Sequence, residues 1–339
     1  MGRVDRLHAV SADEGPDLRQ DGASDLIGPA SRLAGRLVDA LATSVRAPTS
    51  TLTAAVACML SGGHLLIEDV PGVGKTVLAK SLARASGCGF SRLQCTADLL
   101  PSDVTGVHIY DQRTQSFEFR PGPVFANVVL ADEINRASPK TQSALLEAME
   151  ESQVTVDGHT RPLASPFMVI ATMNPVEYEG TFALPEAQLD RFAVRLAIGY
   201  PDLADEADML LDLSVRDPVA DTEVVADEAQ LRSALHAVER VHVDPAIARY
   251  VAQIVAATRS DRRLVLGASP RAGLTLLRVA RAVALIGGTG YVAPEHVKHV
   301  AEVVLAHRLM MGPDARLGGV TGADVVAEAL YAVPTPGFG

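Results

Sequence analysis

The chain has 339 residues, 48% hydrophobic and 21% charged, which is enough apolar side chain for two domains with buried cores. Its net charge of −11 disfavours sequence-independent binding to nucleic acid, and no apolar run approaches the roughly 18 residues of a membrane-spanning helix. Three cysteines without metal-ligand spacing indicate reduced thiols, so we expect a cytoplasmic protein without structural disulfides.

The N-terminal part changes character near residue 26. Residues 1–25 are polar and acidic and lack hydrophobic periodicity, which predicts a flexible tail and neither a signal peptide nor an anchor. From Ser31 to Leu60 apolar residues recur at helical spacing, in two segments broken at Pro48. We therefore expect a pair of helices before the first strand.

Short apolar runs then alternate with helical segments. The predicted strands cover residues 64–70, 92–95, 128–131, 167–172 and 194–198, and the helices between them cover 75–85, 138–151 and 185–191. Two further segments, 106–120 and 153–163, alternate around polar turns as β-hairpins do. This order predicts an α/β core over residues 26–200, with a parallel five-stranded sheet flanked by helices and two hairpin inserts.

After Pro201 the strand pattern ends. Helical periodicity occupies residues 202–215, 227–238, 244–259, 269–286 and 294–309. Two of these segments begin with an acidic or Ser N-cap followed by Pro, a common start of a helix. They predict a smaller, all-α domain over residues 201–330, followed by a flexible end at 331–339.

The strongest chemical signal is the glycine-rich turn between the first strand and its helix. The residues expected to contact nucleotide phosphates there are Pro71, Gly72, Val73, Gly74, Lys75, Thr76 and Val77. Glycines let backbone N–H groups surround phosphates, and the following helix adds its dipole. Lys75 would reach the β- and γ-phosphates, and the Thr76 hydroxyl would ligate Mg²⁺. Asp69 replaces the first glycine of the usual pattern, so its carboxylate must point away from the phosphates.

A second signal is the apolar run Val128–Ala131, which ends in Asp132 and Glu133. A strand of this kind ends at the carboxyl edge of the sheet, so both acids would lie beside the phosphate loop. Asp132 could then hold Mg²⁺ together with Thr76, and Glu133 could polarise a water for attack on the γ-phosphate. The alternative, a strand that simply ends in exposed acids, is the minor interpretation once the phosphate loop is present.

Three further candidates have weaker patterns of their own. Asn174 follows the strand at 167–172, where a neutral amide could contact the γ-phosphate or the attacking water. Arg191 ends a short helix, and Arg271 lies in the first turn of the helix at 269–286. Guanidinium groups suit the charge that develops in phosphoryl transfer, but surface arginines are common in any protein.

Taken together, these blocks resemble the MoxR family of AAA+ ATPases. The resemblance spans roughly residues 25–325 and rests on the segments 68–76, 122–127, 130–137, 140–149 and 184–192. It implies a P-loop AAA+ core with a helical lid, ATP and Mg²⁺ as ligands, and hydrolysis of ATP. It also implies that Ile27 and Gly28 contact adenine, although Pro29 departs from the family pattern beside them.

The resemblance also assigns roles to the three weaker candidates. Asn174 would be the first sensor, Arg191 an arginine finger acting on the nucleotide of a neighbouring subunit, and Arg271 the second sensor. A finger of this kind implies a homo-oligomeric ring, most often a hexamer. The family assembles or activates client proteins, often beside partners that contain a von Willebrand factor A domain.

Three other functions stay open from the sequence. The chain could be a nucleotide-gated scaffold with little turnover, a DNA motor, or the ATPase subunit of a magnesium chelatase. Basic and acidic residues balance in the hairpin at 106–120, and only Arg161 is basic in the hairpin at 153–163. No cationic stripe for a specific nucleic acid is therefore evident.

Overall fold

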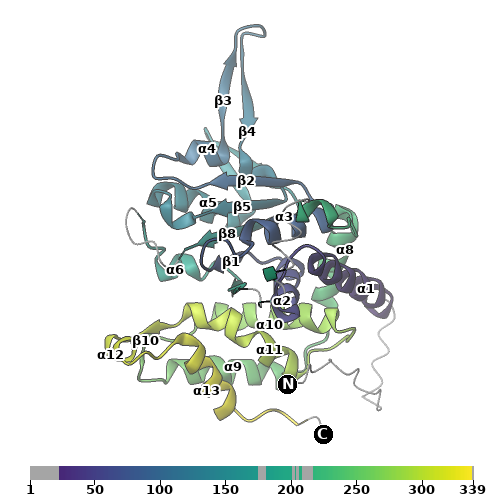
Figure 1. Ribbon diagram of the computed structural model, residues 1–339, viewed down its shortest axis with the longest axis vertical. Coiled ribbons are helices and arrows are strands. Elements are labelled where there is room, and N and C mark those ends of the chain that lie inside the picture. The colour runs from purple at the N-terminus through teal and green to yellow at the C-terminus, as the bar shows by residue number, and fades with distance from the viewer. Residues whose placement is uncertain (1–22, 175–180, 201–202, 204–205, 208–216, 338–339) are drawn as a thin grey trace.

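The computed structural model describes residues 23–174, 181–200, 203, 206–207 and 217–337 (Figure 1). Its centre is a parallel five-stranded sheet with the strand order β2-β5-β8-β1-β9. The strands are β1 (Leu65–Glu68), β2 (Phe90–Gln94), β5 (Val128–Asp132), β8 (Met168–Met173) and β9 (Val194–Leu196). The predicted α/β core is confirmed.

Helices cover both faces of the sheet because its strands are apolar on both sides. Leu65, Ile67 and Leu130 face one hydrophobic core, while Leu66 and Val129 face the other. The first core includes α1 (Ala23–Ala42), α2 (Thr49–Leu60) and α3 (Lys75–Ala85), and the second includes α4 (Pro101–Thr105) and α5 (Pro139–Glu151). The chain between β8 and β9 carries the short α6 (Glu186–Leu189).

Two antiparallel hairpins leave the core where they were predicted. The first consists of β3 (Gly106–Asp111) and β4 (Ser116–Pro121) and projects away from the body in Figure 1. The second consists of β6 (Gln153–Val156) and β7 (His159–Pro162). Its turn residues, Asp157 and Gly158, have φ values of 50° and 78°, as a two-residue hairpin turn requires.

The C-terminal part is a helical lid, most of which lies below the sheet in Figure 1, while its first helix, α8, lies beside α1. Its helices are α8 (Glu228–Arg240), α9 (Pro245–Arg259), α10 (Pro270–Ile286), α11 (Pro294–Leu305), α12 (Pro313–Leu317) and α13 (Gly322–Ala332). The side chains of Asp227, Asp244 and Ser269 cap α8, α9 and α10 by accepting backbone N–H groups. The helix expected at 202–215 falls largely outside the described residues.

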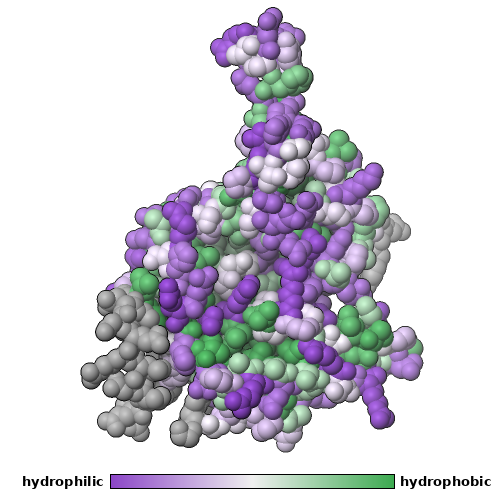
Figure 2. All heavy atoms as spheres, turned by 180° about the vertical axis from the view of Figure 1, so that it is seen from behind, coloured by the Kyte–Doolittle hydropathy of each residue, from purple (hydrophilic) through white to green (hydrophobic). Residues whose placement is uncertain are grey.

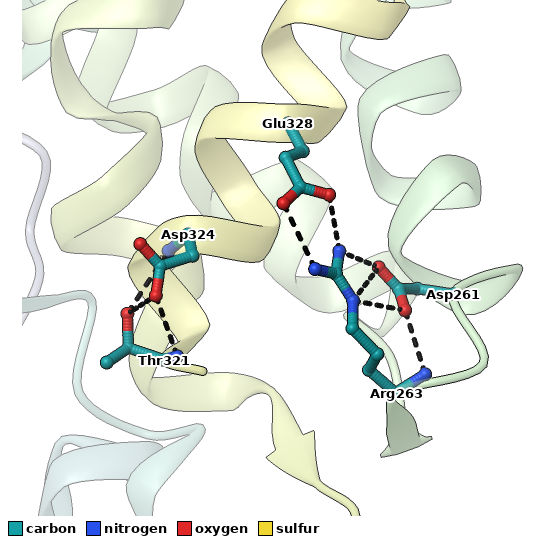
Figure 3. A network of polar contacts seen from close by, with 5 residues as sticks. All are labelled: Asp261, Arg263, Thr321, Asp324 and Glu328. Carbon is teal, nitrogen blue, oxygen red and sulfur yellow. Dashed lines mark hydrogen bonds and ion pairs between the residues drawn. The ribbon is translucent and has the colours of Figure 1, made fainter. Parts of the chain in front are cut away.

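The lid also holds a small sheet that the sequence did not predict. β10 (Leu264–Leu266) pairs with β11 (Met310–Met311). Strands of two or three residues are too short to show a period-two pattern. Beside them, Arg263 joins Asp261 at 2.7 Å and also binds Glu328 on α13 (Figure 3). These ion pairs raise the pKa of Arg263. They also link α13 to the segment between α9 and β10.

The first helix begins earlier than expected. α1 starts at Ala23 rather than near Ser31, and Pro29 lies inside it. Ile27 and Gly28 are therefore helical and do not form a separate segment ahead of the helix. The apolar face of α1 explains the extension, because Ile27 packs on the same core as the buried Ala30 and Leu33. No helix among the described residues is long and apolar enough to span a membrane.

Candidate functional site

The phosphate loop connects the carboxyl end of β1 to α3. Gly72 and Gly74 have φ values of 88° and 92°, a region that side chains other than glycine rarely adopt. Lys75, the first residue of α3, donates from Nζ to the carbonyl oxygens of Asp69 and Met173. The loop therefore bends sharply into a helix N-terminus, where backbone N–H groups and the helix dipole favour an anion.

Asp69 points away from this loop, as its chemistry requires. Its Oδ2 accepts hydrogen bonds from the backbone N–H groups of Ile198 and Gly199, both at 2.7 Å. Its Oδ1 accepts from the N–H of Val70 at 2.8 Å. The carboxylate thus ties the loop to the chain after β9, which explains how an acid can replace the first glycine of the pattern.

The two acids at the end of β5, Asp132 in the strand and Glu133 directly after it, both contact Thr172, a buried residue of β8. Its hydroxyl donates to Asp132 Oδ1 at 2.6 Å and accepts from the backbone N–H of Glu133 at 2.9 Å. Glu133 has a φ of 57°, so the chain turns sharply after Asp132. Asn174 follows the end of β8 and is buried, and β8 lies between β5 and β1. The structure therefore brings Asp132, Glu133 and Asn174 to the same sheet edge as the phosphate loop.

Arginines neutralise both acids. Arg92, on β2, lies 2.6 Å from Asp132 Oδ2, and Arg136 lies 2.9 Å from Glu133 Oε2. The amide of Gln94 also donates to Glu133, at 3.3 Å. The nearby thiol of Cys95 has its pKa raised to about 12, first by burial and then by the two carboxylates, so it stays protonated. A metal cation at the carboxyl edge would therefore have to exchange with an arginine for the carboxylate oxygens of Asp132 or Glu133.

Arg191 and Arg271 meet at a different place. Arg191 lies 3.0 Å from Glu150 Oε2, and Arg271 lies 3.0 Å from Glu150 Oε1. One carboxylate near the end of α5 thus holds one arginine from the core and one from the lid. The structure brings these two candidates together, but away from the phosphate loop.

The position of Glu150 follows from its neighbour Met149. The carbonyl oxygen of Met149 is 3.0 Å from Nε2 of His64, the residue directly before β1. Glu150 therefore lies at the amino edge of the parallel sheet, whereas the phosphate loop follows the end of β1. The four residues of β1 alone separate the two edges by about 13 Å at 3.3 Å per residue.

His64 supports this edge from inside the core. The N–H of Val169 donates to its Nδ1, so Nε2 carries the proton and donates to Met149. Burial lowers the pKa of His64 to about 4, so the ring is neutral at physiological pH. The neutral ring links β8, β1 and the end of α5.

Ile27 and Gly28 lie in the first part of α1. The Ile27 side chain lies against Gly290, where an added Cβ would be only 3.2 Å from its Cδ1. Helix α1 does pack on α3, the helix that begins at the phosphate loop. An adenine-binding role for these two residues stays a prediction.

Several residues at both edges were missed in the sequence. They are Arg92, Gln94, Arg136, Glu150 and Thr172. The position of Thr172, in the strand before Asn174, was the best available signal, because strand ends meet at one sheet edge. Nothing local distinguishes Arg92 or Glu150 from other charged residues, since their partners are distant in sequence.

A parallel sheet with a phosphate loop after β1, two consecutive acids at the end of β5 and a helical lid defines a P-loop nucleotide-binding protein of the AAA+ class. Residues 64–194 match the ATPase family associated with various cellular activities, and residues 256–329 match the AAA lid domain. The fold, the site and these matches agree with one another.

Individual relatives show to which family within the AAA+ class the chain belongs. The chain is 42% identical to chaperone MoxR1 of Mycobacterium tuberculosis, over 82% of this chain and 76% of the relative. It is 50% identical to the uncharacterized protein YeaC of Bacillus subtilis, over 83% and 88%. A crystal structure of a candidate ATPase from Cytophaga hutchinsonii superposes with a TM-score of 0.86 at 34% identity, over 93% and 98%. The chain belongs to the MoxR family of AAA+ ATPases, and its activity is hydrolysis of ATP.

Proposed function

We propose that the chain hydrolyses Mg²⁺-ATP in a ring of identical subunits and uses the cycle to remodel, assemble or activate a client protein. In this proposal residues 26–200 form the nucleotide-binding core, and the lid begins at residue 201. Each active site would lie between the carboxyl edge of one subunit and the amino edge of the next.

The carboxyl edge would hold the nucleotide. Backbone N–H groups of Gly72–Val77 and the Lys75 ammonium would bind the phosphates, with Pro71 shaping the start of the loop. The Thr76 hydroxyl and the Asp132 carboxylate are hard oxygen donors that suit Mg²⁺, which would neutralise charge on the phosphates. Glu133 would accept a proton from the attacking water, and Asn174 would orient that water or the γ-phosphate.

The amino edge carries the argument for a ring. Arg191 and Arg271 share Glu150 at this edge, remote from the phosphate loop of the same chain. Guanidinium groups that stabilise phosphoryl transfer must reach the γ-phosphate. We therefore propose that both arginines act on the nucleotide of a neighbouring subunit, with six subunits as the family resemblance implies. The shared position of these arginines is the observation that carries the proposal.

The two hairpins are suited to transmit the cycle to a client. His108 on β3 lies 2.6 Å from Asp157 in the turn of the second hairpin. The guanidinium of Arg161 lies 3.9 Å from the ring centre of Phe119 on β4. These contacts join the first hairpin, near its base, to the turn and the second strand of the second hairpin. Farther out, Ile109, Tyr110 and Phe117 are exposed, and Figure 2 shows apolar atoms on the projecting hairpin.

The client itself is proposed from the family. A protein that contains a von Willebrand factor A domain is the partner to try first. The exposed apolar side chains of the first hairpin and the balance of its charges favour a protein partner over nucleic acid.

The test is steady-state ATP hydrolysis by the wild type and Glu133→Gln, with both proteins sized by light scattering in the presence of Mg²⁺ and ATP. Loss of the carboxylate should lower turnover by roughly 10² or more, while ATP binding and assembly persist. Equal and slow turnover by two proteins that both bind ATP would contradict the proposed role of Glu133. It would favour a scaffold whose ATP state controls assembly.

A further inference from the structure

A buried arginine of the lid, Arg308, contacts the short segment around Arg191. Arg308 follows α11 and is only 2% exposed at its side chain. Its Nη2 donates to the carbonyl oxygen of Phe192 at 2.8 Å and to that of Asp190 at 3.2 Å. Its Nε lies 3.1 Å from Asp190 Oδ1. One side chain of the lid therefore hydrogen-bonds to the backbone on both sides of Arg191.

His307 adds a second contact to the same place. Its Nε2 is 3.0 Å from the carbonyl oxygen of Phe192. Burial, and then the charge of Arg308, keep the pKa of His307 well below its ordinary value, so the ring is neutral. Because that carbonyl accepts the bond, Nε2 is the protonated nitrogen. Phe192 itself is fully buried, so this backbone has little freedom to shift independently of the lid.

The lid also reaches the Arg191 side chain. Arg271, at the start of α10, binds one oxygen of Glu150, and Arg191 binds the other. Without that carboxylate two cations would lie side by side and repel each other. The lid thus contacts the backbone of the finger through Arg308 and its side chain through Arg271 and Glu150.

We propose that the lid positions the arginine finger of its own chain, with Arg308 and Glu150 as positioning residues for Arg191. The consequence is that the lid of one subunit controls hydrolysis in the next subunit. This inference rests on the proposed action of Arg191 on a neighbouring nucleotide. Misplacement of a catalytic group by about 1 Å can cost roughly 10²-fold in rate, so modest lid changes would have large effects.

Arg308→Lys is the main test, because lysine keeps the charge but lacks the planar guanidinium whose Nη2 binds both carbonyl groups while its Nε lies beside Asp190 Oδ1. We expect turnover to fall by at least tenfold, with ATP affinity unchanged because the phosphate loop lies at the other edge. Arg263→Lys is the matched control, since this lid arginine forms its ion pairs within the lid (Figure 3). It should retain wild-type turnover.

Mixed rings separate positioning from a general defect. Glu133→Gln subunits cannot hydrolyse ATP but carry an intact finger, so they should restore turnover at neighbouring Arg308→Lys sites. As the reference, Arg191→Ala subunits are mixed with Glu133→Gln subunits in the same way. Rescue of both variants supports the inference. Rescue of Arg191→Ala alone, or wild-type turnover by Arg308→Lys, overturns it.

Failure of both variants to be rescued would instead contradict the proposed action of Arg191 between subunits. Because Arg308 is buried, Glu150→Gln provides a second variant whose position is partly exposed and which should fold normally. It should lose turnover, keep ATP affinity and be rescued by Glu133→Gln. If folded Glu150→Gln has wild-type turnover, the positioning role of Glu150 is wrong.

Discussion

The two edges of the central sheet carry opposite charge arrangements. At the carboxyl edge two acids, Asp132 and Glu133, are each paired with an arginine. At the amino edge two arginines, Arg191 and Arg271, share one acid. The first arrangement can exchange an arginine for a metal cation, and the second can present guanidinium groups to an anion. Each edge therefore supplies what the other lacks, which favours a site completed between subunits.

The edges also differ in how they are built. The carboxyl edge arises from short segments whose order in the sequence already predicts their meeting. The amino edge joins α5, the segment before β9 and the lid, which are distant along the chain. Substitutions in the phosphate loop should consequently impair ATP binding, whereas substitutions at the amino edge should lower turnover and leave ATP affinity unchanged.

The largest expected difference comes from Arg191→Ala compared with Lys75→Ala. Removal of an arginine finger should reduce turnover by roughly 10³-fold while the dissociation constant for ATP stays unchanged. Lys75→Ala should instead abolish ATP binding, because the phosphate loop loses its cation. Fluorescent-nucleotide titration and a phosphate-release assay measure the two effects. A loss of ATP affinity in Arg191→Ala as large as its loss of turnover would contradict the separation between binding at the phosphate loop and catalysis at the amino edge.

The amino edge should also be sensitive to acid through His64. Its pKa is lowered to about 4 in the folded chain from 6.5, so the unfolded chain binds the proton more tightly. The stabilisation is therefore complete above pH 6.5 and is lost as the pH falls towards 4. Between pH 7.5 and pH 5 this residue should lower the free energy of unfolding by about 2 kcal/mol.

Urea denaturation of His64→Gln at both pH values measures that contribution, since glutamine can make both hydrogen bonds without titrating in this range. His236→Gln is the control, because the His236 side chain is 74% exposed. His64→Gln should lose about 2 kcal/mol less than the wild type on acidification, and His236→Gln should match the wild type. An identical pH dependence in both variants would show that His64 does not couple to folding.

At the carboxyl edge a smaller effect should arise from Arg92. In the proposed site this arginine would compete with Mg²⁺ for Asp132 Oδ2, and an ion pair at a half-exposed site contributes about 1 kcal/mol. Arg92→Gln should thus lower the Mg²⁺ concentration for half-maximal turnover about fivefold. Arg113→Gln, at the exposed hairpin tip, should leave it unchanged. A higher Mg²⁺ requirement in Arg92→Gln would mean that Arg92 orients Asp132 for the metal.

The smallest effect belongs to neither edge. Phe117 on the projecting hairpin is 70% exposed, so Phe117→Ala should change the free energy of unfolding by no more than about 0.5 kcal/mol. Basal ATP turnover should also stay at the wild-type level. Thermal unfolding and phosphate release check both expectations. A large loss of basal turnover would show that the hairpin takes part in the chemistry of the edges.

Much of the fold was predictable because local patterns determined it. The loop before α3 and the acids after β5 each follow a short apolar strand, so their positions at one edge could be inferred. Helix α1 was less predictable, because Pro29 normally opens or ends a helix whereas here it lies within one. The short β10 and β11 carry too few residues for a periodic signal.

The amino edge could not be derived in the same way. Glu150 and Arg271 are 121 positions apart, and Arg308 is more than a hundred positions from the carbonyl groups that it binds. Their meeting depends on how the lid packs against the core, which periodicity does not encode. Only the family resemblance selected Arg191 and Arg271 among the many arginines of the chain.

The central claim is that the two edges form one active site only when subunits assemble. The most direct test measures ATP turnover per chain over a dilution series, with the assembled fraction determined by light scattering at each concentration. The account predicts that turnover per chain falls in proportion to assembly and becomes negligible for monomers. Constant turnover per chain down to fully monomeric protein would contradict it.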